Sequence, residues 1–161
     1  MLKTVGILFL LICAAARADL SAPLETDDPA CASIKASPAF QSFVQTFVAA
    51  INSRNREALK ACFHPKSLPI LAKDKEYADG IFDDAFSDPI PAKYEVLLKA
   101  LEPGDVTQIE KDEGTAYPVK PTVQMEIKWK LGPKGEEIAG GLMLISDGGK
   151  WYSVVGTRPT K

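Results

Sequence analysis

Residues 37–52 read SPAFQSFVQTFVAAIN and predict the clearest helix of the chain. Ser37 is a suitable N-cap, and Pro38 suits the first helical position. The apolar residues recur at helical spacing on one face, which carries Phe40, Phe43, Val44, Phe47, Val48 and Ile51. Such a stripe of phenylalanines is typical of core packing, so we expect this face to lie against a sheet.

The C-terminal third of the chain predicts that sheet. Between residues 122 and 131, polar residues alternate with Val123, Met125, Ile127, Trp129 and Leu131. This alternation, with a period of two residues, predicts a strand with one buried face and one face exposed to solvent. Turns at 132–135 and 147–149 then predict two further strands, over 138–145 and 151–155. Gly140-Gly141 in the first of these suggests a bulge or a close approach.

The remaining segments complete the expected order of elements. A second helix is predicted over 56–63, ending at His64-Pro65 because a residue before proline is pushed out of helical space. Residues 66–72 are interpreted as a connector, 74–86 as a third helix and 94–101 as a strand. Helices followed by antiparallel strands predict an α+β fold, with the N-terminal helices packed on one face of a curved antiparallel sheet.

The beginning of the chain predicts export. Lys3, the apolar run 5–16 and Ala16-Arg17-Ala18 fit a signal peptide over residues 1–18, with Asp19 as the mature N-terminus. The run is too short for a membrane-spanning helix. A lipoprotein acylated at Cys13 is the alternative, although the bulky Ile12 precedes this cysteine. We expect a secreted or periplasmic protein that does not stay in a membrane after cleavage.

The mature chain is expected to be one domain over 37–161, preceded by a loosely ordered segment over 19–36 that carries two prolines and no periodicity. The chain has 161 residues, and loss of Lys3 and Arg17 with the signal peptide leaves 17 basic against 21 acidic residues, a net charge of −4. This balance gives no electrostatic reason to bind nucleic acid or an anionic membrane.

Two cysteines remain in the mature chain, Cys31 and Cys62. Because disulfides persist in exported proteins, we expect these two residues to be bridged. The loop of about 30 residues would then stabilise the fold by roughly 3–4 kcal/mol in the chain-entropy model. Two unpaired thiols, one of them buried, are the alternative.

Two segments carry a family resemblance: residues 47–65, FVAAINSRNREALKACFHP, and residues 147–156, DGGKWYSVVG. They resemble the first two helices and the closing hairpin of the nuclear transport factor 2-like (NTF2-like) superfamily, which includes the SnoaL-like and ketosteroid-isomerase-like proteins. The resemblance covers residues 37–161 and implies a cone-shaped fold that encloses a pocket. A cystatin-like arrangement with extra helices would look similar, because residues 66–88 lack the early strand pair of typical members. The resemblance transfers no catalytic residue.

The candidate functional residues are few. His64 is the only histidine and a candidate base, or else a helix-terminal histidine that contacts free carbonyls. The aromatic candidates for lining a pocket are Tyr77, Tyr94, Trp129 and Trp151. The acidic residues of the third helix are interpreted as a solvated face. No spacing indicates a metal or a cofactor, so we expect neither.

These observations favour an exported, non-catalytic domain that binds a small apolar or amphipathic ligand, or a protein partner, through its pocket or sheet face. The second hypothesis is an isomerase- or hydrolase-type enzyme that uses His64 or a pocket carboxylate. The third is a structural dimerisation module, a homodimer built through the outer sheet face.

Overall fold

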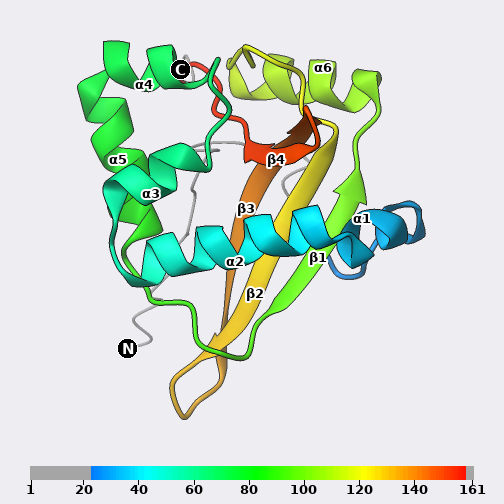
Figure 1. Ribbon diagram of the computed structural model, residues 1–161, viewed down its shortest axis with the longest axis vertical. Helices are drawn as coiled ribbons and strands as arrows, with labels where there is room; N and C mark the ends of the chain where they lie inside the picture. Colours follow the sequence, from blue (N-terminus) through cyan, green and yellow to red (C-terminus); the bar gives the residue numbers. More distant parts are fainter. Residues whose placement is uncertain (1–22, 159–161) are drawn as a thin grey trace.

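A four-stranded antiparallel sheet in the order β1-β2-β3-β4 forms the centre of the structure (Figure 1). The structure is a computed structural model that describes residues 23–158, so the expected signal peptide lies outside the described residues. The strands are β1 (Glu95–Ala100), β2 (Val123–Leu131), β3 (Glu136–Asp147) and β4 (Lys150–Ser153). The predicted α+β class and antiparallel pairing are therefore confirmed.

The alternation in β2 sets which face of the sheet is buried under the N-terminal helices. The expectation that its other face is exposed to solvent is wrong, because Gln124 and Glu126 are buried as well. Met125 pairs with Leu142, and Val123 pairs with Leu144, and all four side chains belong to the main core. The expected bulge at Gly140-Gly141 is wrong, because these glycines pair in unbroken register with the neighbouring strand. No other side chain approaches the Cβ position of Gly141.

Helix α2 (Pro38–Asn52) crosses this sheet face and confirms the helix predicted from the phenylalanine stripe (Figure 1). The Ser37 hydroxyl caps it by accepting a hydrogen bond of 3.2 Å from the Phe40 amide. Its buried residues are Phe40, Phe43, Val44, Phe47, Ala50 and Ile51. The Phe40 ring meets the ring of Trp151 edge-on at 5.5 Å, which joins the start of the helix to β4.

Three shorter helices continue the layer beyond the end of α2: α3 (Arg56–Ala61), α4 (Leu68–Lys73) and α5 (Lys75–Ala85). Helices α3 and α5 lie within the ranges predicted for them, whereas α4 occupies the expected connector. Pro69 does not prevent α4, because proline is tolerated in a first helical turn. Asp74 ends α4 and caps α5, since its carboxylate accepts a 3.0 Å hydrogen bond from the Tyr77 amide.

Helix α6 (Pro103–Glu113) was not predicted and covers the opposite face of the sheet at one end. Glu102 and Asp105 form a reciprocal capping box at its start. Its Val106 and Ile109 are buried with Met143, which projects from β3 on the side opposite to the main core. Helices therefore lie on both faces of the sheet, because α2 and α6 belong to separate hydrophobic clusters on its two sides.

The lead-in expected to be loosely ordered instead forms two short helices, η2 (Pro29–Cys31) and α1 (Ala32–Ala36). Two aspartates before them hold β1. The Asp28 amide donates to the Leu98 carbonyl at 2.8 Å. The amides of Leu98 and Ala100 in turn donate to the carboxylates of Asp27 and Asp28, at 3.0 and 3.1 Å. These bonds satisfy backbone groups of an edge strand, so they order the segment.

The expected disulfide is wrong, because Cys31 and Cys62 are both free and buried. Cys31 follows the residues that bind β1, whereas the Cys62 carbonyl accepts a 2.8 Å hydrogen bond from the Ser153 amide in β4. Strands β1 and β4 are the two outer strands of the sheet. Strands β1 and β4 are separated by three strand spacings of about 4.8 Å each. Because the two cysteines lie beside these opposite edges of the sheet, they are too far apart for a disulfide, which needs Cα atoms within roughly 7 Å.

Among the described residues, no helix is both long enough and apolar enough to cross a membrane. The membrane question raised by the apolar run 5–16 lies outside the described residues.

The first prediction concerns the two thiols. Burial raises the pKa of Cys62 to about 11, and burial followed by the nearby carboxylates of Asp28 and Asp27 raises the pKa of Cys31. Because the thiolate is the reactive form, iodoacetamide should label neither cysteine in the native protein at neutral pH. Both should be labelled once guanidinium unfolds the chain without reductant, as mass spectrometry would show. A chain that takes up label only after reduction would contradict this assignment.

The second prediction concerns Glu126 on the outer face of β2. Its carboxylate accepts a 2.6 Å hydrogen bond from the Leu24 amide, and burial raises its pKa despite Lys128 nearby. A raised pKa means that the charged carboxylate destabilises the folded state above that pKa. Glu126→Gln should therefore increase the free energy of unfolding at neutral pH, with a gain that shrinks as pH falls through the raised pKa.

Urea unfolding at several pH values measures this gain. Glu136→Gln, at an exposed position of the neighbouring strand, is the control for losing one negative charge. A neutral-pH loss of stability in Glu126→Gln would mean that the carboxylate stabilises the fold.

Candidate functional site

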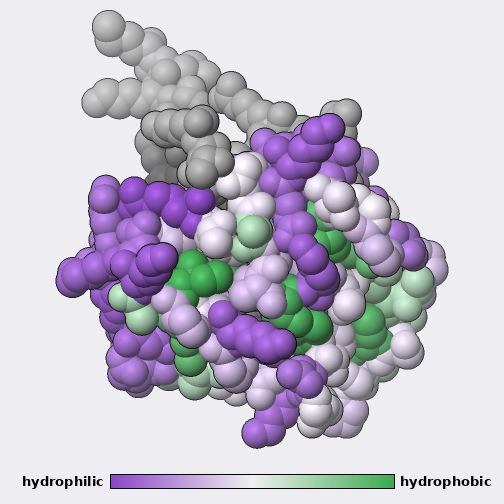
Figure 2. Space-filling model, turned by 90° about the horizontal axis from the view of Figure 1, so that it is seen from above, coloured by the Kyte–Doolittle hydropathy of each residue, from purple (hydrophilic) through white to green (hydrophobic). Residues whose placement is uncertain are grey.

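A groove of about 630 Å³ lies between α3, α4 and α5. Its apolar lining includes Leu68, Leu71, Ala72, Ala78 and Phe82. Among the described residues, Leu68 is the large hydrophobic side chain left exposed, at 38%. Viewed from the end of the molecule that carries α4 and α6, hydrophobic residues form small patches between hydrophilic ones (Figure 2). The groove has the size and the apolar lining of small-molecule sites.

Helical spacing directs the apolar lining into the groove. Leu68 and Leu71 lie three residues apart on one side of α4, and Ala78 and Phe82 lie four apart on α5. Phe82 is almost completely buried and packs against Phe63 at 6.0 Å between ring centroids, so it forms a fixed floor.

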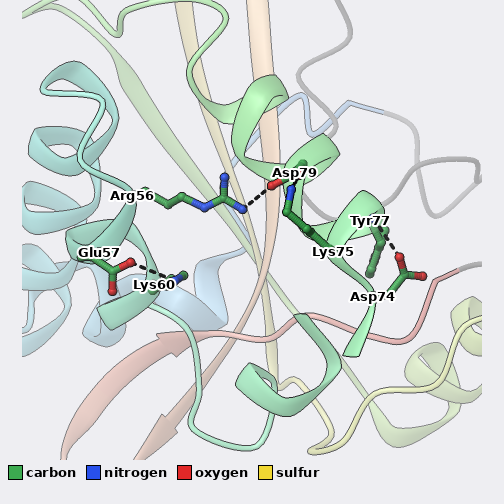
Figure 3. Close-up of polar contacts among 7 residues, drawn as sticks. All are labelled: Arg56, Glu57, Lys60, Asp74, Lys75, Tyr77 and Asp79. Carbon is green, nitrogen blue, oxygen red and sulfur yellow. Dashed lines mark hydrogen bonds and ion pairs between the residues drawn. The ribbon is translucent and has the colours of Figure 1, made fainter. Parts of the chain in front are cut away.

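Cationic side chains line the same groove. The Arg56 guanidinium reaches from α3 to α5, where Nη2 donates to Asp79 Oδ1 at 2.5 Å (Figure 3). Its central carbon lies 4.2 Å from the centre of the Phe82 ring, within range of a cation–π interaction. Lys75, one helical turn before Asp79, also donates to this carboxylate. Hydrogen bonds from Lys75 and Arg56 lower the pKa of Asp79, so the carboxylate stays charged at neutral pH.

Lys60 lies one turn after Arg56 on α3 and also lines the groove. Its ammonium donates to Glu57 Oε1 at 2.8 Å on the same helix. The Glu57 side chain is 80% exposed, and such surface pairs contribute little because water screens them. The charged groove lining thus comprises three cations and Glu57, in a chain that is acidic overall.

His64 is buried and lies in neither of the two grooves described here. Its Nε2 is 3.1 Å from Asp147 Oδ2, and its Nδ1 accepts a 3.2 Å hydrogen bond from the Lys66 amide. This arrangement fits a neutral ring that carries its proton on Nε2. Since both nitrogens are engaged, neither is placed to take a proton from a substrate in this conformation.

Neither of the two grooves described here gathers the other predicted pocket residues. Tyr77 and Trp129 are buried in the main core, and Tyr94 packs against it half-buried. Trp151 lines a second, smaller groove of about 340 Å³ between α2 and β4. The predicted set is therefore divided between the core and this second groove.

The acidic residues of α5 divide in two ways. Glu76, Asp83 and Asp84 are exposed, in agreement with a solvated face, whereas Asp79 binds Arg56 and Lys75. Among the residues that the structure describes, no group of His, Cys, Asp or Glu could hold a metal ion.

The groove does not follow from the sequence prediction, because helix α4 occupies most of residues 66–72, where a connector is expected. The signal was present, since Leu68, Leu71 and Ala72 follow i, i+3, i+4 spacing and a proline stands in the first turn. Local periodicity does not indicate whether other elements of the fold cover the apolar face of this short helix, and here the face remains partly exposed.

Comparison with known proteins does not assign this chain to a family. No family model matches the chain, and neither curated proteins nor solved structures give a significant match. The resemblance to the NTF2-like superfamily therefore stays a prediction.

The third prediction tests the Arg56 contact across the groove. Arg56→Gln removes both the bond to Asp79 and the stacking on Phe82, so it should lower the free energy of unfolding. Lys75→Gln should have a smaller effect, because the Lys75 side chain is 88% exposed. Urea unfolding of both variants, combined with Asp79→Asn in a double-mutant cycle, measures the coupling. Equal coupling of Arg56 and Lys75 to Asp79 would contradict the structural difference between them.

Proposed function

We propose that this protein binds a small amphipathic ligand in the groove between α3, α4 and α5. The observation that carries the proposal is the groove itself, which has a volume of about 630 Å³ and an apolar lining that includes the exposed Leu68. A concave site of this size that combines apolar lining with a few charged groups is typical of small-molecule binding.

The binding energy would come from the apolar body of the ligand. A hydrocarbon or aromatic group that lies in the groove against Leu68 removes from water its own apolar surface and the exposed surface of this leucine. Each methylene buried in this way contributes about 0.8 kcal/mol, equivalent to a three- to fourfold change in affinity. The charged rim then selects the polar end of the ligand.

The proposal extends to compartment and family. With the signal peptide expected at residues 1–18, the mature protein would meet its ligand in the periplasm or outside the cell. Membership of the NTF2-like superfamily would agree with ligand binding, because many members of that group are non-catalytic binding modules. In this chain the candidate groove lies among the helices rather than inside a cone formed by helices and sheet.

Two observations weigh against the alternative functions. An enzyme based on His64 has less support, because Asp147 and the Lys66 amide already occupy both ring nitrogens. A dimer through the outer sheet face has less support because α6 packs there on Met143 and the Leu24 amide binds Glu126.

The fourth prediction tests the groove directly with uncharged ligands. Calorimetry with hexanol, heptanol and octanol should show affinity rising about three- to fourfold per methylene. Ala72→Trp places an indole in the groove from an exposed position and should weaken octanol binding by about tenfold or more, the effect of losing roughly two methylene contacts.

Ala92→Trp adds the same indole to an exposed loop before β1 and serves as the matched control. Affinities that do not depend on chain length, or that fall equally in both variants, would remove the groove as the binding site.

A further inference from the structure

We infer that the ligand of this groove carries a carboxylate, which Lys60 and Arg56 receive at the groove mouth, so that the ligand class is the monocarboxylic acids with an apolar body. The inference rests on the proposed function, because it assigns the head group of a molecule that the groove must first bind.

The spacing of the two cations on α3 brings them together. Arg56 and Lys60 are four residues apart, which places their side chains on the same side of the helix, and both line the groove. Their side chains are 42% and 39% exposed, so each reaches solvent while it lies beside apolar surface. An anionic head at this position would contact both cations while its apolar body extends toward Phe82.

Arg56 retains hydrogen-bonding capacity in this position. Its Nη2 donates to Asp79, and a guanidinium carries five N–H donors in one plane. The bond to Asp79 and the contact with Phe82 hold that plane in place, so little side-chain entropy remains to be lost on binding an anion. A planar carboxylate matches this donor geometry better than a hydroxyl does, because it accepts with two charged oxygens.

Lys60 is the cation whose partner is easiest to replace. Glu57 is the i−3 neighbour on the same helix and is mostly exposed, so its bond to Lys60 contributes little. A ligand carboxylate seated between Lys60 and Arg56 would be less hydrated than Glu57, and its attraction to the ammonium would be stronger. Lys60 can therefore exchange its intrahelical partner for the ligand at small cost.

The charge of the lining favours an anionic head group over a neutral or cationic one. Arg56, Lys60 and Lys75 oppose Glu57, and counting Asp79 beside them still leaves one net positive charge. A cationic head would be repelled, and a neutral head would gain no Coulomb energy. An acidic protein has no general attraction for anions, so a preference for an acid would arise locally at this groove.

The fifth prediction compares three probes with one alkyl body: octanoate, octanol and octylammonium. Calorimetry at low ionic strength should show octanoate binding about five- to tenfold more tightly than octanol, as expected for a charge-assisted bond at a half-exposed site. Octylammonium should bind most weakly, and added salt should reduce the differences between the three probes.

Variants locate the head group. Lys60→Gln should reduce the preference for octanoate over octanol, because it removes one of the two cations that receive the carboxylate. Glu57→Gln, which removes the competing carboxylate from Lys60, should strengthen octanoate binding relative to octanol. Lys134→Gln, an exposed lysine in the turn between β2 and β3, is the matched control for losing one positive charge and should keep the wild-type preference.

The outcomes separate this inference from the proposed function. If octanol and octanoate bind equally, and Ala72→Trp weakens both, the groove binds ligands but the carboxylate assignment is wrong. The assignment is also wrong if the octanoate preference survives in the Arg56→Gln/Lys60→Gln double variant, because the anion then lies elsewhere. If none of the three probes binds, the proposed function itself fails.

Discussion

The burial of one face of α2 against β2 and β3 is the constraint on which the rest of the structure depends. Phe47 of the helix and Met125 of β2 have almost no exposed surface, and they belong to one core. The end of α2 is fixed in addition by Asn52, whose side-chain amide both donates to and accepts from the backbone of Ile90 at 2.8 Å. With both ends of the helix placed, α3 to α5 must fold back beside it, and their facing sides enclose the groove.

The parts of the fold predicted from sequence are those set by local periodicity. The phenylalanine stripe of α2 and the alternation of β2 each repeat over enough residues to indicate one structure. Helix α6 has only Val106 and Ile109 as buried apolar residues, so its periodicity is weak, although Glu102 and Asp105 already marked a capping box. Helix α4 has six residues, one of them a proline, so it is too short to show a clear helical repeat of apolar residues.

Long-range placement explains the remaining differences. Whether Cys31 and Cys62 meet depends on the order of strands in the sheet, which no local pattern encodes. The same holds for the candidate site: Arg56 and Lys60 look like ordinary surface residues of a short helix until Phe82 of another helix is placed beside them. Most of the aromatic pocket candidates are core residues. Aromatic side chains are typical of hydrophobic cores as well as of ligand pockets, so residue type alone does not separate the two roles.

The attachment of Asp27 and Asp28 to β1 has a consequence for association between molecules. A bare outer strand invites another chain to extend its ladder, which is how many proteins begin to polymerise. Here the carboxylates occupy the amides of Leu98 and Ala100, and at the far side the backbone of Phe63 and His64 runs along Ser153. Two short stretches of chain thus protect the outer strands from pairing with another molecule, and proteolytic trimming of the chain beyond residue 28 would remove one of them.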